Sequence, residues 1–220
     1  DGIYGPTETV VVADDAADEL HVFVLKHIGK GLPFHIVAHS SGGLVARAFV
    51  RRYPDVWEHS KPSQSDEPQR TGRLVLLGSP NHGWFASLAL LLGTEDLQRK
   101  LALIDLTAGL PEIRRVFASF PSLYQTLPSP RRNLAWEAFY DARSYGKLAV
   151  PQTLLDQGLA FHNEIAPAVD PQRMVCILGH QQATVNDVEN PSNLSSPGYW
   201  TMTMQGDGRT AHALALLERD

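Results

Sequence analysis

A serine flanked by small residues stands between a β-forming run and an amphipathic run. Ser40 lies in residues 38–43, Ala-His-Ser-Ser-Gly-Gly, which match the pattern G-x-S-x-G with Ala38 in the first position. Small neighbours let the backbone reverse sharply from a strand into a helix and hold the serine in a strained, exposed conformation. The sequence therefore predicts that Ser40 is a nucleophile and that the Ser41 N–H helps to stabilise an oxyanion. The alternative is that Ser40 or Ser41 only caps the helix.

A nucleophilic serine needs a base, and the base needs a carboxylate that orients it. On folds with this serine turn, the order along the chain is serine, acid, histidine. Asp207 lies between two glycines, after the last predicted core strand and before a helical run at residues 211–217. Flanking glycines allow a turn that directs the carboxylate inward, so Asp207 is the predicted acid, although Gly-Asp-Gly is also common in ordinary turns. The rival carboxylates Asp187 and Glu189 fall in a polar segment that we expect to be a solvated loop.

The histidine base is harder to place. His212 is the only histidine after Asp207, and it follows five positions later. It would lie in the first turn of the next helix, too close in sequence to come round a further strand. His212 is therefore a weak candidate, and an exposed or half-buried histidine at a helix start is expected instead. His180 ends a predicted strand but precedes the acid, and His82 is expected to form hydrogen bonds in a loop. The sequence thus predicts no working triad histidine within residues 1–220.

The elements that must position these residues are short. Three runs of β-forming residues occupy residues 34–38, 73–78 and 173–179. All three are apolar throughout, which is typical of parallel strands covered on both faces. Helical periodicity flanks the first run, at residues 14–28 and 42–53. In the second helix Arg47 and Arg51 lie off the apolar face, and residues 9–12 are a candidate fourth strand. These elements predict an α/β fold in which helices flank a mostly parallel sheet.

Residues 81–171 separate the second and third strands and contain no convincing strand. A loop of that length does not fit inside a compact domain, so we interpret this segment as an inserted helical cap or lid. Residues 1–80 and 172–220 then form the core. The apolar residues 84–92 could line an acyl-chain pocket, but packing of the cap onto the sheet is the preferred interpretation for most of them. Helices are expected at residues 97–106, 112–117 and 154–165.

Four separated motifs resemble one branch of a known superfamily. They lie at residues 35–47, 75–83, 120–128 and 206–208. Together they resemble the lecithin:cholesterol acyltransferase-like lipase and acyltransferase branch of the α/β-hydrolase superfamily. The resemblance implies an α/β-hydrolase fold and a serine esterase, lipase or acyltransferase that acts on an acyl ester, with Ser40 as nucleophile and Asp207 as acid. The family pattern has Gly where Ala38 stands and usually Met where Ser41 stands.

Two features of that family are missing from the sequence. No Gly-rich strand-to-helix loop, the usual source of a second oxyanion N–H, precedes Ser40, and no strand and histidine follow Asp207. We therefore expect residues 1–220 to be the middle of a larger hydrolase domain that is incomplete at both ends. The alternative function is a catalytically inactive α/β-hydrolase-like binding or scaffold module that keeps the serine turn without the triad histidine.

Composition excludes several other classes. The chain has 19 Lys and Arg against 24 Asp and Glu, a net charge of −5 and a pI near 6.0, so it lacks the basic surface of a nucleic-acid-binding protein. Cys176 is the one cysteine, which excludes an internal disulfide. His35 and His39 lack the helix and Glu of an H-E-x-x-H metal site, so neither metal nor cofactor is predicted.

No apolar run approaches the roughly 20 residues of a membrane span. A soluble, cytoplasmic protein with a lipid-like small-molecule substrate and at most transient membrane-surface contact is favoured.

Overall fold

Three short strands form one parallel sheet. The computed structural model describes residues 13–29, 32–60, 71–104 and 109–217. The strands pair in the order β1-β2-β3, and they are β1 (Ile36–His39), β2 (Leu74–Leu77) and β3 (Met174–Ile177). They confirm the three predicted runs, and with the surrounding helices they make a mixed α/β fold. The candidate strand at residues 9–12 lies outside the described residues.

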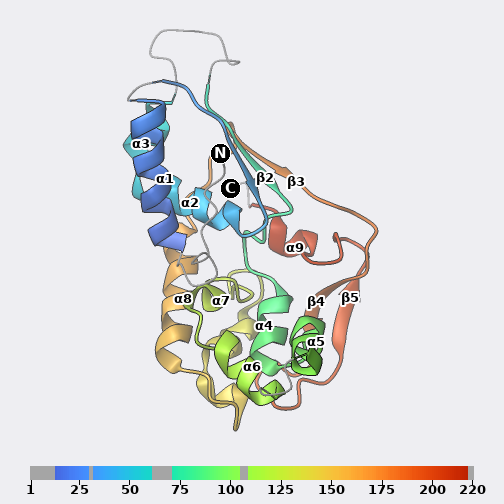
Figure 1. The fold of residues 1–220 in the computed structure, drawn as a ribbon. Helices are drawn as coiled ribbons and strands as arrows, with labels where there is room; N and C mark the ends of the chain where they lie inside the picture. Colours follow the sequence, from blue (N-terminus) through green and yellow to red (C-terminus); the bar gives the residue numbers. More distant parts are fainter. Residues whose placement is uncertain (1–12, 30–31, 61–70, 105–108, 218–220) are drawn as a thin grey trace.

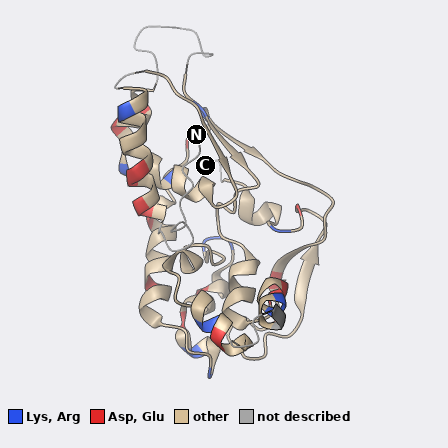
Figure 2. Cartoon of the chain, in the orientation of Figure 1, with Lys and Arg blue, Asp and Glu red and all other residues tan. Residues whose placement is uncertain are grey.

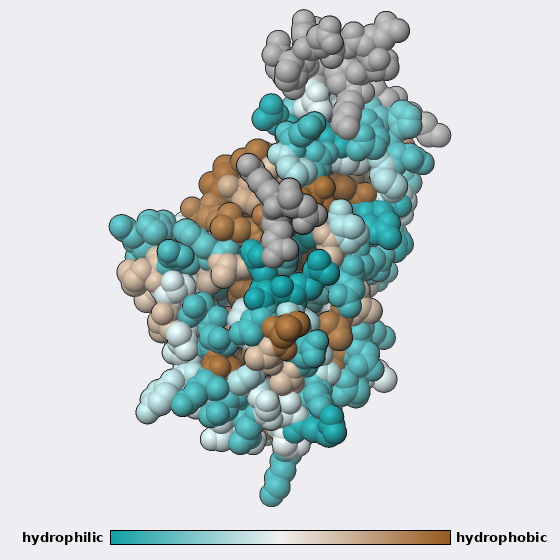
Figure 3. All heavy atoms as spheres, turned by 180° about the vertical axis from the view of Figure 1, so that it is seen from behind, coloured by the Kyte–Doolittle hydropathy of each residue, from teal (hydrophilic) through white to brown (hydrophobic). Residues whose placement is uncertain are grey.

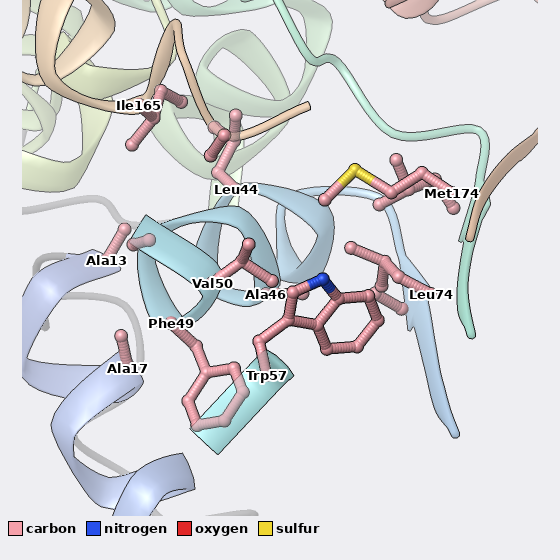
Figure 4. Close-up of a cluster of buried hydrophobic side chains, with 14 of the residues drawn as sticks. Ala13, Ala17, Leu44, Ala46, Phe49, Val50, Trp57, Leu74, Ile165 and Met174 are labelled. Atoms are coloured by element: carbon pink, nitrogen blue, oxygen red, sulfur yellow. The ribbon is translucent and has the colours of Figure 1, made fainter. Parts of the chain in front are cut away.

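Three helices lie on one side of this sheet (Figure 1). They are α1 (Ala13–His27), α2 (Gly42–Arg52) and α3 (Pro54–Glu58), of which α1 and α2 confirm the predicted helices. Helix α2 packs directly on the strands, and α1 and α3 contact α2. Alternate strand residues such as Leu74 and Leu76 are buried against α2. Figure 4 shows how Phe49 and Trp57 share the same cluster as Leu74. Burial of each such aromatic or leucine side chain stabilises the folded state by roughly 2 kcal/mol through the apolar area that it removes from water.

The opposite face of the sheet is apolar but uncovered in the described part of the chain. Val37, Val175 and Ile177 are 67%, 40% and 53% exposed. The strands themselves carry no charged side chain (Figure 2), and the surface in Figure 3 has an apolar area in the half of the molecule that holds the sheet. The prediction of strands covered on both faces is therefore wrong for the described residues. The strands are apolar on both faces, but helices pack on the α2 face alone.

The described residues between β2 and β3 are helical and contain no strand. The elements are α4 (Phe85–Leu92), α5 (Asp96–Ile104), α6 (Leu110–Phe117), α7 (Pro121–Gln125), the 3-10 helices η2 (Leu134–Tyr140) and η3 (Ala142–Tyr145), and α8 (Gln152–Ile165). We call residues 81–171 the cap. Phe85, Leu88 and Leu91 are buried in a second hydrophobic cluster that belongs mainly to the cap. The preferred interpretation, in which this run packs on the sheet, is therefore wrong: the run builds the interior of the cap.

A two-stranded antiparallel hairpin follows β3 and was not predicted. Its strands are β4 (Thr184–Val188) and β5 (Trp200–Thr203), and the short helix α9 (His212–Ala215) comes after them. The hairpin packs on the cap, where the rings of Trp200 and Phe85 lie 6.4 Å apart, centroid to centroid. Asp187 is half-buried in β4 and accepts a hydrogen bond from Trp136 Nε1 at 2.8 Å. Asp187 is thus a structural residue and not a solvated loop carboxylate, whereas Glu189 is exposed as expected.

Arg47 is buried, contrary to its predicted place on the polar face of α2. Its side chain is 1% exposed and donates hydrogen bonds to the carbonyls of Asn81, Ile165 and Ala168. Burial lowers the pKa of Arg47 to about 10, which still leaves it charged at neutral pH. Arg47 therefore joins α2 to the start of the cap and to its end. Ile165 of the cap is also buried in the hydrophobic cluster that α1 and α2 form with the strands. The cap and the core thus share packing, and their division into separate domains stays a prediction.

Candidate active site

Ser40 occupies a sharp turn between β1 and α2. Its φ angle is +53°, in the left-handed region that non-glycine residues rarely adopt and that costs on the order of 1–3 kcal/mol. The Ser40 N–H donates to Leu77 O at 2.9 Å, which holds the turn against the end of β2. The hydroxyl forms no hydrogen bond with the described residues. The sequence predicted this geometry from the small neighbours of Ser40, while the nucleophilic role itself stays a prediction.

The Ser41 N–H follows Ser40 in the turn and has no hydrogen-bond partner among the described residues. Ser41 is the N-cap residue of α2, and its side chain makes no capping hydrogen bond. Its backbone N–H forms no hydrogen bond with any described residue, while its carbonyl accepts from Leu44 N at 2.9 Å. The helix-capping alternative for Ser40 and Ser41 thus has no hydrogen bond to support it. An unpaired N–H at the positive end of a helix can stabilise an oxyanion.

Gly43 lets α2 begin this close to the sheet. A Cβ atom on Gly43 would lie 2.3 Å from Ser79 Oγ and 2.5 Å from Ser79 Cβ. Ser79 is fully buried just after β2, so it has little room to move. The contact was not predicted because it joins residues from separate parts of the chain. A glycine is therefore required here for tertiary packing, in addition to the needs of the turn.

Asp207 lies at the same edge of the sheet as Ser40. Its Oδ1 accepts hydrogen bonds from the N–H groups of Arg209 and Thr210 at 2.8 and 2.7 Å. Its Oδ2 points toward Gly78, where a Cβ would be only 3.1 Å away, and Gly179 packs on its Cβ. Gly78 follows β2 and Gly179 follows β3, so the carboxylate rests against the ends of two neighbouring strands. No described residue donates a hydrogen bond to Oδ2, which leaves it free to accept one from a base.

The hairpin returns Asp207 to this edge. After β3 the chain runs out through β4 and β5 and comes back at Gly206, whose Cβ would lie 2.3 Å from Thr184 Oγ1. Gly208 has a φ of +87° and donates from its N–H to Thr184 Oγ1 at 2.8 Å. Thr184 was not singled out in the sequence because its role depends on this long-range contact. Thr184 therefore constrains both glycines beside Asp207: it leaves no room for a Cβ on Gly206, and it accepts a hydrogen bond from Gly208.

His212 is close to this loop but is occupied elsewhere. Its Nε2 pairs with the carbonyl of Gly179 at 2.7 Å, and its ring stacks on His180 with centroids 5.5 Å apart. All nine histidines fall in the described ranges, and none of them hydrogen-bonds Asp207 there. His212 is half-buried at the start of α9, as the sequence predicted. The structure therefore brings Ser40, Ser41 and Asp207 to one edge of the sheet without a paired histidine.

His82 and His162 are both buried. His82 forms backbone hydrogen bonds with Leu214 and Ser129, but its Nε2 has no partner in the described part of the chain. Its hydrogen-bonding role is thus carried by its backbone and not by Nε2. Burial, reinforced by nearby arginines, lowers the pKa of His82 to about 3. His162 Nε2 lies 2.8 Å from Leu127 O, and since a carbonyl only accepts, the tautomer with its proton on Nε2 donates this hydrogen bond. Burial lowers the pKa of His162 to about 4.

Acid should therefore destabilise the protein through His162. The unfolded chain takes up a proton near the ordinary pKa of 6.5, whereas the folded chain resists protonation down to about 4. Neutral His162 therefore makes its full contribution to the free energy of unfolding above pH 6.5. This contribution falls as the pH drops toward 4, with a loss on the order of 3 kcal/mol. Urea unfolding of His162→Gln should show a shallower loss between these pH values than the wild type. His27→Gln, an exposed position on α1, should keep the wild-type slope; equal slopes in all three proteins would rule out His162 as the cause.

The described residues hold no group of three or more His, Cys, Asp or Glu side chains arranged for a metal ion. His35 accepts from Arg73 N at 3.2 Å, and His39 is the last residue of β1. Across the same described ranges, no helix is long and apolar enough to cross a bilayer.

The architecture has a counterpart among solved structures. A chain in the crystal structure of the Tle4–Tli4 complex is similar over 96% of this chain and 53% of that chain, with a TM-score of 0.51 and 15% sequence identity. The chain therefore spans about half the length of the solved chain, and at this identity the likeness concerns the fold alone. No protein-family model matches the sequence, and no curated protein matches it.

Proposed function

We propose that this chain is a serine hydrolase of the α/β-hydrolase fold, similar to the lecithin:cholesterol acyltransferase-like branch, that acts on acyl esters as an esterase, lipase or acyltransferase. The observation that carries this proposal is the left-handed Ser40 between β1 and α2, with the Asp207 carboxylate against the ends of β2 and β3. Strained backbone of this kind is typical of functional sites, and Ser40 is a half-buried serine at such a turn. The free Ser41 N–H supplies one oxyanion donor.

The chemistry follows from these groups. A base removes the Ser40 proton as Oγ bonds to the ester carbonyl carbon, and the Ser41 N–H donates to the oxyanion that forms. The C–O bond to the alcohol then breaks, and the base returns the proton to the leaving alcohol. Water or an acceptor alcohol attacks the acyl-enzyme and releases Ser40. Asp207 orients the base and stabilises its charged form through Oδ2.

A second candidate is a non-catalytic module of the same fold. It is favoured by one observation: His212 is bound to the Gly179 carbonyl, and within the described ranges no histidine is paired with Asp207. Such a module would keep the Ser40 turn for packing and would bind a ligand or partner without turnover.

A fluorophosphonate probe separates the two candidates. In an active site, Ser40 Oγ forms a bond to phosphorus, fluoride leaves, and the base takes the serine proton. On the full-length protein we expect a single adduct, which peptide mass spectrometry should place on Ser40, and no adduct after heat denaturation. Labelling that is absent, or spread over serines such as Ser41 and Ser195, would overturn the hydrolase proposal in favour of the non-catalytic module.

A further inference from the structure

The side chain of Arg209 connects the loop that carries Asp207 to the cap. Arg209 extends away from the loop, and its guanidinium forms an ion pair with Glu95 at 3.1 Å. The same guanidinium lies over the Trp84 ring, with Cζ 5.0 Å from the ring centroid. Trp84 immediately precedes α4, and Glu95 lies between α4 and α5. Arg209 thus contacts the cap at both ends of α4.

The backbone of the same residue holds the carboxylate. Arg209 N–H donates to Asp207 Oδ1 at 2.8 Å. A shift of the Arg209 side chain therefore moves the Arg209 backbone, whose N–H holds the Asp207 carboxylate directly. On the cap side, Glu95 is fixed by α5, because its carbonyl accepts from Gln98 N at 3.1 Å. The connection from α4 and α5 to Asp207 is thus continuous and consists of direct contacts.

This connection forms part of the wall of a cleft of about 420 Å³. Glu95 and Arg209 line the cleft together with Phe85, Val185 and Trp200, which come from the cap and the hairpin. Glu95 is 20% exposed and Arg209 59% exposed, so water screens the ion pair only in part. The aromatic face of Trp84 adds a cation–π contact, which strengthens the attachment.

We propose that Arg209 is a positioning residue that fixes the Asp207 carboxylate relative to the cap. This role rests on the proposed function of Asp207 as the acid. The carboxylate acts by orienting a base, and a displacement of about 1 Å in such a group can lower turnover by about a hundredfold. Loss of the Arg209 contacts should therefore lower kcat and leave substrate binding nearly unchanged. It should also make the charged base less stable and move the acidic limb of the pH profile to lower pH.

The test compares four variants with the wild type, each made in the full-length protein, using p-nitrophenyl butyrate as the probe substrate. Arg209→Gln and Glu95→Gln break the ion pair, and Arg209→Lys keeps the charge. Arg143→Gln is the matched control because it breaks an exposed Asp141–Arg143 pair away from the loop. We expect Arg209→Gln and Glu95→Gln to lower kcat about tenfold with KM within about twofold. Arg209→Lys should recover most of the loss, and Arg143→Gln should match the wild type.

Hydrogen exchange gives a readout that does not depend on turnover. Arg209→Gln should speed exchange of the backbone amides at positions 209 and 210, which donate to Asp207 Oδ1, while Arg143→Gln should not. If the wild type is active and Arg209→Gln changes neither kcat nor this exchange, the role of Arg209 is overturned and the hydrolase proposal stands. If the wild type neither hydrolyses the ester nor takes the fluorophosphonate, the proposed function fails, and the role of Arg209 fails with it.

Discussion

Replacing Ser40 with alanine is expected to lower ester hydrolysis by about 10⁴-fold or more, because the attacking oxygen is removed while the oxyanion donor remains. Ser40→Ala should fold like the wild type, since the Ser40 hydroxyl forms no hydrogen bond with the described residues and alanine tolerates the φ of +53° no worse than serine. Steady-state rates of the full-length proteins with p-nitrophenyl butyrate, together with thermal unfolding of each, measure both effects.

Ser41→Ala provides the matched control for this result. Ser41 is the neighbouring residue, its side chain is exposed, and it forms no capping hydrogen bond. Only its backbone N–H is assigned to the oxyanion, and alanine keeps that N–H. We expect Ser41→Ala to retain activity within about threefold. Equal losses in the two variants would contradict a nucleophilic Ser40 and would point to a role of the turn in packing.

Local pattern was sufficient to predict the elements around Ser40. The strand at β1 and the helix at α2 have clear apolar runs, and small residues between them leave one plausible backbone path. Asp207 could be chosen because two glycines flank it just before a helix. These signals are contained in a few consecutive residues, so they do not depend on the remainder of the fold.

Long-range contacts account for what was missed. β4 contains Asn186 and Asp187, polar residues that read as a loop, yet Asp187 is half-buried because Trp136 of the cap donates to it. Arg47 reads as a surface residue of an amphipathic helix, yet three backbone carbonyls surround it. In both cases the polar side chain is compensated by a partner more than thirty positions away, and a single sequence gives no signal for such a partner.

A long-range contact also decides which glycine of the site can be replaced. Gly42 and Gly43 are adjacent and look equivalent in the motif, but only one of them is restricted by its surroundings. A Cβ on Gly42 would meet no atom within 4 Å, whereas a Cβ on Gly43 would overlap Ser79. The motif predicts that small residues are needed after Ser40, and the tertiary contact decides which of them must be glycine.

Gly43→Ala is therefore expected to destabilise the protein by about 3 kcal/mol, because the new methyl group must displace either α2 or the buried Ser79. Gly42→Ala should leave stability unchanged or raise it by up to about 1 kcal/mol, since alanine restricts the unfolded chain and fits a helix. Urea unfolding of the two variants at neutral pH measures the difference. Because the two changes are chemically identical and one residue apart, the difference reports the Ser79 contact and not helix propensity.

A compensating change tests the cause directly. In the Gly43→Ala background, Ser79→Gly removes both atoms that the new methyl group would overlap, and it leaves Leu76 Cδ2 at 3.0 Å as the remaining close contact. Ser79 Oγ has no hydrogen-bond partner among the described residues, so its removal costs no hydrogen bond there. The double variant should therefore be more stable than Gly43→Ala alone. If Ser79→Gly lowers stability equally in both backgrounds, the two residues are not coupled, and the approach of α2 to the end of β2 is not limited at this contact.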